Sequence, residues 1–288
     1  MSKLDVLIIA AALVIAFIIA LAFSTGEADY WVLLTRLGDE EIYLVLGVLV
    51  YYFAGDFTTS VSVLTSVLVS GSLNVFLKYM FNTPRPLNPL VEATGPGFPS
   101  GHAQVSSSFW LAISMGAKRS SLTLLSLVVI TGVSLSRIYL RAHYPIDVIG
   151  GLLFGVTSAI LSYYSTKGFA TGRKQYLVAL LVSAILIGAY NLLVLNIEHG
   201  AVTALLGLTS SLLLSLIAFN KYLDSLKFIS VRSRVACFIV SSFSLIALHY
   251  STEFINPFSR AVLFFLMGLV VFVGLPFYTS RYRICKCS

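Results

Sequence analysis

Long apolar runs, separated by short polar stretches, recur along most of the chain. A helix needs about 17–25 mostly apolar residues to cross a bilayer, and all of these runs but one approach or reach that length. The pattern therefore predicts an all-α fold, a polytopic transmembrane helical bundle. The predicted spans are Val6–Phe23, Glu41–Ala54 (the shortest), Phe57–Met80, His102–Ala117, Leu122–Tyr139, Ile146–Tyr164, Leu177–Leu195, Ala201–Phe219, Val235–Tyr250 and Ala261–Thr279.

Composition supports a membrane protein. Hydrophobic residues make up 58% of the 288 positions and charged residues only 11%, whereas soluble domains carry about 25% charged residues. The formal net charge of +7 would suggest nucleic acid in a soluble protein. Here most Lys and Arg lie in short loops, which is typical of topology control, and no nucleic-acid partner is expected.

The distribution of basic residues also predicts an orientation. With the N-terminus in the cytoplasm, most of the 19 Lys and Arg residues fall on the cytoplasmic side, as the positive-inside rule requires. We therefore expect an integral protein of the cell membrane with both termini in the cytoplasm and the proline-rich loop 82–99 outside.

A polar, basic stretch at 165–176 divides the predicted spans into six and four. This division predicts a six-span core at 1–164, a basic cytoplasmic linker at 165–176, and a four-span C-terminal extension of unknown role at 177–288. Segment 24–40 mixes aromatic and charged residues, and we expect it to lie as an amphipathic piece at the membrane interface.

Candidate chemistry begins at Ser100, Gly101 and His102, which open the fourth predicted span. A helix start has unpaired N–H groups and a partial positive charge, so it can bind an anion. Ser100 is a good N-cap residue, and Gly101 allows a ligand to approach the backbone closely. The simpler interpretation is a capped helix after a turn, with no ligand.

Four basic residues fall on the outer side near this helix start: Lys78, Arg85, Arg137 and Arg141. Charges at membrane depth are costly and usually functional. Each one alone could instead extend toward lipid phosphates. The convergence of four on one face favours an anion site.

His143 and Asp147 fall on the same side, around the predicted start of the sixth span. A carboxylate that accepts a hydrogen bond from one imidazole nitrogen fixes the tautomer and leaves a lone pair on the other. This arrangement suits a nucleophilic histidine. The simpler interpretation is that Asp147 only caps the helix.

Together these residues predict a phosphoryl-transfer site. Cations and helix N–H groups would bind a tetrahedral phosphate, His143 would attack phosphorus, and His102 would protonate the departing oxygen. Since no cluster of carboxylates is available to hold a metal, neither a metal nor another cofactor is expected.

The motifs Lys78-(six residues)-Arg85-Pro86, Pro99-Ser100-Gly101-His102 and Ser136-Arg137-(five residues)-His143-(three residues)-Asp147 occur in this order. They resemble the three-part signature of the type 2 phosphatidic acid phosphatase superfamily. That superfamily includes lipid phosphate phosphatases, polyprenyl diphosphate phosphatases, glucose-6-phosphatase and vanadium haloperoxidases. The resemblance covers Val6–Tyr164.

This resemblance implies a role for each motif residue. Lys78, Arg85 and Arg137 bind phosphate, and Ser100 and Gly101 add hydrogen bonds to it. His143 forms a phosphohistidine, Asp147 orients His143, and His102 is first the general acid and then activates water. No catalytic role is implied for Arg141, which could reach the lipid head group.

We therefore expect a metal-independent membrane phosphatase that acts on a lipid phosphate or diphosphate at the extracytoplasmic face, with a polyprenyl diphosphate as the first choice of substrate. The partners expected are this substrate and membrane lipids, with no obligate protein partner. Phosphatidate or phosphatidylglycerol phosphate is the nearest rival substrate. The same residues would also suit a lipid phosphotransferase, or a phosphatase core fused to a transporter- or flippase-like unit.

Overall fold

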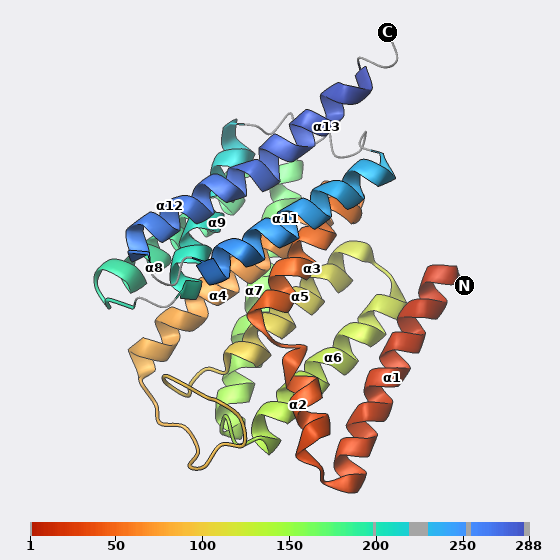
Figure 1. The fold of residues 1–288 in the computed structure, drawn as a ribbon, viewed down its shortest axis with the longest axis vertical. Coiled ribbons are helices and arrows are strands. Elements are labelled where there is room, and N and C mark those ends of the chain that lie inside the picture. Colours follow the sequence, from red (N-terminus) through yellow and green to blue (C-terminus); the bar gives the residue numbers. More distant parts are fainter. Residues whose placement is uncertain (1, 198–199, 219–229, 252–254, 285–288) are drawn as a thin grey trace.

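The computed structural model describes residues 2–197, 200–218, 230–251 and 255–284. Within these residues the chain is helical and contains no strand (Figure 1). The helices are α1 (Lys3–Thr25), α2 (Ala28–Arg36), α3 (Glu40–Phe53), α4 (Phe57–Phe81), α5 (Gly101–Ala117), α6 (Ser120–Tyr139), α7 (Pro145–Ala170), α8 (Lys174–Leu193), α9 (Gly200–Ala218), α11 (Val231–Ser251), α12 (Pro257–Leu269), the π-helix η2 (Val270–Gly274) and α13 (Leu275–Ile284).

The all-α polytopic bundle is confirmed. Helices occupy the described part of each predicted span, and eight of them are long and apolar enough to cross a membrane when the continuous stretch of α12, η2 and α13 is counted as one. Of the other two predicted spans, α5 has 17 residues, the lower end of the range that can cross a bilayer, and α3 has only 14. At 1.5 Å per residue, α3 is about 21 Å long, less than the roughly 30 Å of a bilayer core.

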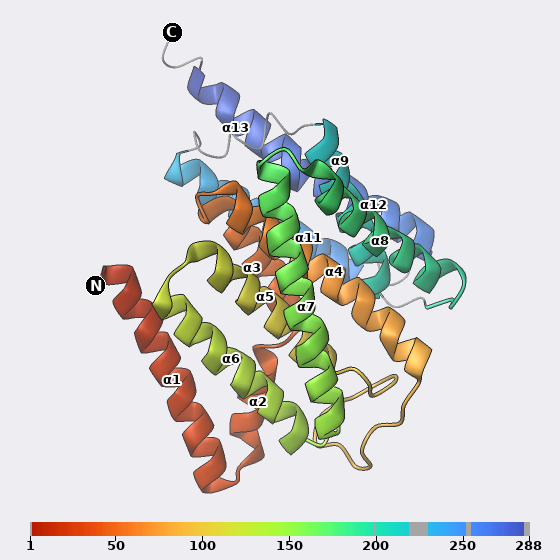
Figure 2. The same cartoon turned by 180° about the vertical axis from the view of Figure 1, so that it is seen from behind.

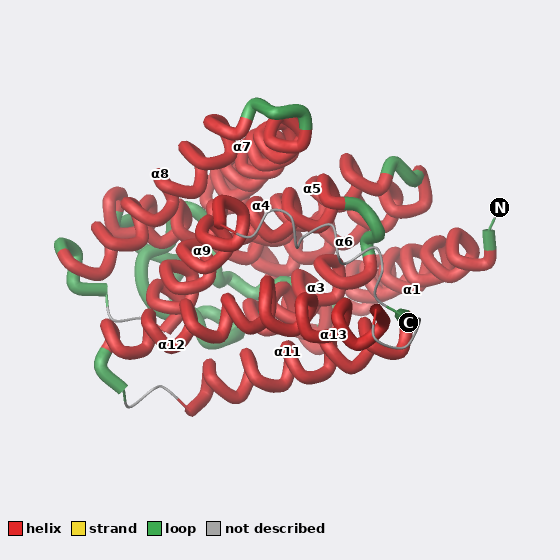
Figure 3. The backbone as a smooth tube through the Cα atoms, turned by 90° about the horizontal axis from the view of Figure 1, so that it is seen from above, coloured by secondary structure: helices red, strands yellow, loops and turns green. Residues whose placement is uncertain are grey.

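Helices α4, α5 and α7 pack against one another, with α6 and α1 on one side of them and α8, α9 and α12 on the other (Figures 2 and 3). Gly151 and Gly155 make the close approach of α7 to α5 possible. A Cβ atom on Gly155 would collide with Ser107 and with the backbone of Gln104. Small residues at such crossings are typical of membrane helix pairs.

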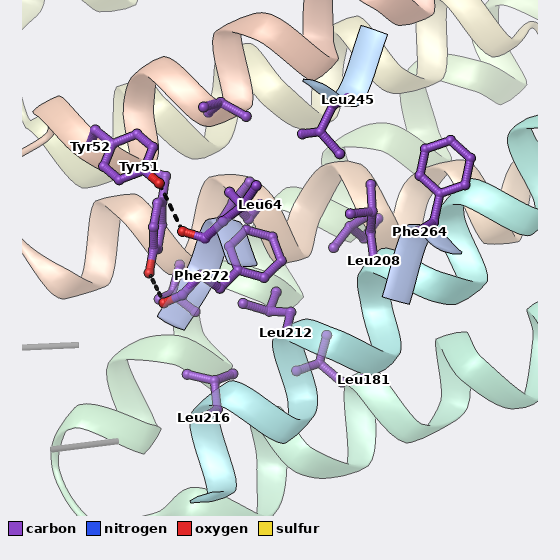
Figure 4. Packing of buried hydrophobic residues seen from close by; sticks show 14 of the residues in the cluster. Tyr51, Tyr52, Leu64, Leu181, Leu208, Leu212, Leu216, Leu245, Phe264 and Phe272 are labelled. Carbon is purple, nitrogen blue, oxygen red and sulfur yellow. Dashed lines mark hydrogen bonds between the residues drawn. The ribbon is translucent and has the colours of Figure 1, made fainter. Parts of the chain in front are cut away.

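The C-terminal helices share a hydrophobic cluster with α3 and α4. Leu208, Leu212 and Phe264 are buried in the same cluster as Leu64 and Leu68 (Figure 4). Packing therefore does not separate the described helices after residue 177 from the helices before them.

Hydrogen bonds between α3 and η2 strengthen this contact. The hydroxyls of Tyr51 and Tyr52 donate to the carbonyls of Phe272 and Val271, each at 2.8 Å (Figure 4). Pro276 has no N–H group to donate to the preceding turn, so one carbonyl of that turn is available for a partner outside the helix.

Most of the stretch 165–176, predicted as a basic cytoplasmic linker, is helical. Helix α7 continues to Ala170 and α8 begins at Lys174, so only residues 171–173 lie between the two helices. The polar composition of this stretch reflects the ends of two helices, because polar side chains are tolerated where a helix leaves the apolar part of the bundle.

Segment 24–40 forms the short helix α2 and the turn that leads into α3. Trp31, Leu34 and Thr35 are buried on one face of α2, which packs against α1 and α6. The segment is amphipathic, as expected, but its apolar face covers protein and places residues 35–39 beside the candidate site.

Candidate active site

A cavity of about 350 Å³ lies where α4 ends and α5 begins. Six predicted site residues line it, and they come from α4, the loop 82–99, the start of α5, the end of α6 and the turn that follows. These six are Lys78, Arg85, Gly101, His102, Arg137 and His143. Residues as far apart in sequence as 78 and 143 thus meet at one cavity.

His143 and Asp147, predicted as a histidine–carboxylate pair, lie next to each other, although no hydrogen bond joins Nδ1 of His143 to the carboxylate. His143 Nδ1 lies 3.4 Å from Asp147 Oδ2, and both side chains are almost fully buried. The same oxygen of Asp147 accepts a hydrogen bond of 2.9 Å from the backbone N–H of Tyr144. On the opposite side of the ring, His143 Nε2 lies 3.0 Å from Arg85 Nη1.

These contacts specify the state of His143. The Arg85 guanidinium can only donate, so Nε2 must accept and carry the lone pair, while Nδ1 carries the proton and faces Asp147. Burial, together with the charges of Lys78, Arg85 and Arg137, lowers the pKa of His143 below its usual value. A neutral imidazole with its lone pair facing the cations is the form required of a nucleophile.

The loop 82–99 wraps around two of the cations. Arg85 donates from Nε to Gly95 O and from Nη2 to Thr94 O, each at 2.8 Å, and Lys78 Nζ donates to Pro96 O at 2.8 Å. Backbone carbonyls thus hold both side chains at the cavity without neutralising their charge.

Arg137 is buried and donates from Nη1 to Thr35 Oγ1 at 2.8 Å. Its Nε atom and the hydroxyl of Ser100 are buried with no hydrogen-bond partner. Buried polar atoms are usually paired. The Arg137 side chain therefore reaches the cavity with hydrogen-bonding capacity that the protein does not use.

Ser100 occupies the N-cap position of α5, but its side chain makes no capping hydrogen bond. Its backbone N–H donates to Asp147 O at 2.9 Å, which joins the starts of α5 and α7. A Cβ atom on Gly101 would lie 3.1 Å from Asn74 Oδ1, so glycine keeps this first turn close to α4.

Three predicted residues lie off the cavity wall. Ser100 and Asp147 are buried and are not among the lining residues. Arg141 is exposed and does not line the cavity either. Asp147 thus contacts the Nδ1 side of the His143 ring without itself lining the cavity.

Sequence reasoning missed a buried amide pair that fixes the start of α5. Asn74 Nδ2 donates to Gln104 Oε1 at 2.8 Å, and Gln104 Nε2 donates to Ser70 O at 2.9 Å. Both side chains are buried. A signal was present in the sequence, since Asn74 lies four residues before Lys78 and therefore on the same face of a helix.

Sequence reasoning also missed Asp39. Its Oδ1 atom lies 3.2 Å from His102 Nε2. Asp39 is the N-cap residue of α3 but makes no capping hydrogen bond with its side chain. The carboxylate contacts the histidine of another helix, and Gly38 makes this possible, because a Cβ atom there would lie 2.8 Å from His102 Cδ2.

Among the described residues, no group of three or more His, Cys, Asp or Glu side chains is placed to hold a metal ion. The positive charge at the cavity comes from Lys78, Arg85 and Arg137.

Comparison with known proteins identifies a family for the region that carries the motifs. The family model of the PAP2 superfamily matches residues 59–171, which include all three motifs. Residues 59–171 belong to the PAP2 superfamily. Asp39, α9 and α12 lie outside this PAP2 region.

Proteins similar to this chain include glucose-6-phosphatases and an undecaprenyl-diphosphatase. Bovine glucose-6-phosphatase catalytic subunit 1 is 34% identical over 139 residues, which cover 40% of this chain and 38% of that protein. Human glucose-6-phosphatase 3 is 26% identical over 190 residues, which cover 56% and 54%. An undecaprenyl-diphosphatase of Sulfolobus acidocaldarius is 31% identical over 144 residues, which cover 46% and 66%.

These alignments thus span about two fifths to two thirds of the relatives' own length. No solved structure matches the chain significantly.

Proposed function

We propose that the protein is an integral membrane phosphatase that hydrolyses a lipid phosphate or diphosphate through a phosphohistidine. The observation that carries this proposal is the meeting of Lys78, Arg85, Arg137, His102 and His143 at one cavity. Three cations suit the charge of a phosphate group, and the two histidines provide a nucleophile and an acid for the same reaction.

In the first step, His143 Nε2 attacks phosphorus and the bond from phosphorus to the leaving oxygen breaks. Arg85, which contacts Nε2, donates to a phosphate oxygen once the phosphate binds. Asp147 stabilises the positive charge that develops on the ring as the P–N bond forms. His102 donates a proton to the leaving oxygen, so the lipid departs as an alcohol or a monophosphate.

In the second step, His102 is neutral and accepts a proton from water, which attacks the phosphohistidine. The P–N bond breaks, phosphate leaves and His143 is regenerated. Asp39 acts as a positioning residue here, because its carboxylate orients His102 and stabilises its protonated form. If a lipid alcohol replaced water, the same site would transfer the phosphoryl group.

For the substrate, we infer a polyprenyl diphosphate first and phosphatidate or phosphatidylglycerol phosphate second. The name of the Sulfolobus relative supports the former. A water-soluble sugar phosphate is a separate candidate, since several matched relatives are glucose-6-phosphatases.

We further infer that the termini are cytoplasmic and the cavity extracytoplasmic, as the basic residues indicate. A reporter inserted in the loop 82–99 tests this orientation, and a cytoplasmic signal would contradict it.

The proposal predicts phosphate release by the detergent-purified protein from lipid phosphates and diphosphates. We expect activity to persist in EDTA, because Lys and Arg side chains supply the positive charge, and we expect vanadate, which mimics the trigonal transition state, to inhibit. A panel of polyprenyl diphosphate, phosphatidate, phosphatidylglycerol phosphate and glucose 6-phosphate ranks the substrates by kcat/KM. Absence of phosphate release from all four would refute the proposal.

Asp39→Asn tests the positioning of His102. We expect kcat to fall roughly ten- to hundredfold on an alkyl phosphate, which is part of the 10²–10⁴ that general acid catalysis contributes. The loss in kcat/KM, which reports only the steps through formation of the phosphohistidine, should be much smaller on p-nitrophenyl phosphate, whose leaving group needs no proton. Asp39→Glu should restore part of the rate.

Asp56→Asn is the matched control for Asp39→Asn, since Asp56 caps α4 through a 2.8 Å bond from Thr59 N. It should leave kcat near the wild-type value. Equal losses of Asp39→Asn on both leaving groups would indicate a purely structural role.

A further inference from the structure

The cavity continues from the phosphate site along one face of α4. Val67, Gly71, Asn74 and Lys78 all line it, and their spacing of three or four residues places them in one stripe. The stripe runs for roughly 16 Å along the helix axis. Its members change from a cation and an amide near the site to glycine and valine away from it.

The opposite wall comes from helices outside the PAP2 region. Ala201, Ala204, Leu205 and Leu208 of α9 line the cavity, together with Phe264 of α12. Leu205 packs closely on α4, because a Cβ atom on Gly71 would lie 2.9 Å from Leu205 Cδ2. Glycine at this position therefore leaves room for the α9 side chain beside the cavity.

Polarity decreases with distance from the phosphate site. Leu208 and Phe264 are buried and belong to the hydrophobic cluster shared with α3 and α4 (Figure 4). The polar residues Glu41 and His249 also line the cavity, but they lie near the start of α3 and the end of α11. In the antiparallel order of the helices, these are the ends beside the start of α5.

We infer that α9 and α12 build a subsite for the apolar chain of the phosphate substrate, which rests on the function proposed above. We name the subsite the apolar arm and define it by Val67, Gly71, Ala204, Leu205, Leu208 and Phe264. A cavity with three cations at one end and only apolar side chains at the other fits an amphiphile with a phosphate head. A free sugar phosphate would leave the apolar arm unfilled.

The C-terminal helices thereby gain a role in substrate selection. Each methylene that enters the apolar arm should raise kcat/KM by about two- to fourfold until the arm is full. Long-chain phosphates should therefore be preferred over short ones by a wide margin, although the phosphate site is the same for both.

The experiment measures the ratio of kcat/KM for dodecyl phosphate to that for ethyl phosphate in one detergent. Ala204→Phe places a ring in the apolar arm and should lower this ratio at least about tenfold. Leu205→Ala removes apolar contacts without adding volume and should lower it severalfold, which keeps the test available if Ala204→Phe does not fold.

Ile217→Phe is the matched control, because Ile217 lies on the same helix, is 60% exposed and does not line the cavity. It should leave the ratio at the wild-type value. An unchanged ratio in both arm variants, or the same decrease in the control, would overturn the apolar arm alone. Failure of the wild type to hydrolyse either ester would overturn the proposed function, and the inference with it.

Discussion

His143→Ala is expected to abolish phosphate release, with a loss of at least about 10³-fold in kcat. The substitution removes the Nε2 lone pair that faces the cations and leaves Arg85 without one of its contacts. In the proposed mechanism His102, which contacts Asp39, is the general acid, so we do not expect it to replace His143 as the nucleophile.

The measurement combines phosphate release with covalent labelling. Wild-type protein quenched during turnover of a ³²P-labelled substrate should carry label, and His143→Ala should carry none. Ile146→Ala is the control, because Ile146 is close in sequence but 62% exposed, and it should retain activity and label. Full activity in His143→Ala would rule out the phosphohistidine mechanism.

Asp147→Asn is expected to lower kcat by up to about 10⁴-fold, by analogy with the buried carboxylate of a catalytic triad. An asparagine oxygen could still accept from Tyr144 N, which Asp147 Oδ2 does at 2.9 Å. The negative charge would be lost, however. The positive charge that develops on His143 during attack would then be surrounded by Lys78, Arg85 and Arg137 with no compensating carboxylate.

The competing interpretation of Asp147 is that it only caps α7. A lost N-cap interaction costs typically about 1 kcal/mol of stability and leaves the chemistry intact. Thermal stability and kcat measured on the same Asp147→Asn sample therefore separate the two roles. Asp56→Ala removes the cap of α4 and should show the stability loss alone, whereas Asp147→Asn keeps an accepting oxygen and, if Asp147 were only a cap, should keep both stability and kcat. Near-normal kcat in Asp147→Asn would support the capping interpretation.

Much of the fold could be predicted from the sequence because a membrane-spanning helix is identified by the residues of one continuous segment. Each predicted span needed only its own run of apolar residues, and α4, α6 and α7 begin and end within a few residues of the prediction, except where α7 extends to Ala170. That extension was missed because polarity at 165–170 indicates the edge of the apolar layer and does not indicate where a helix ends.

The motif residues could also be grouped from the sequence, since charges and histidines are rare in an apolar chain and topology places them at one end of it. The sequence could not predict Asp39. An aspartate before a helix is an ordinary capping residue, and only the packing of α2 and α3 against α5 and α6 brings its carboxylate to 3.2 Å from His102.

By itself, the sequence determined that the chain is a helical membrane protein and identified the residues that meet at the cavity. Both conclusions follow from the length of the apolar runs and from the order of the motifs, which can be read along the chain. Only the tertiary structure decided that the C-terminal helices share a core with α3 and α4, and that α9 and α12 form a wall of the same cavity. The physical reason is that the apolar residues of a helix, such as leucine and alanine, do not indicate by their type which surroundings they face. Whether they face lipid, a neighbouring helix or a cavity depends on contacts between residues more than a hundred positions apart, such as Gly71 and Leu205.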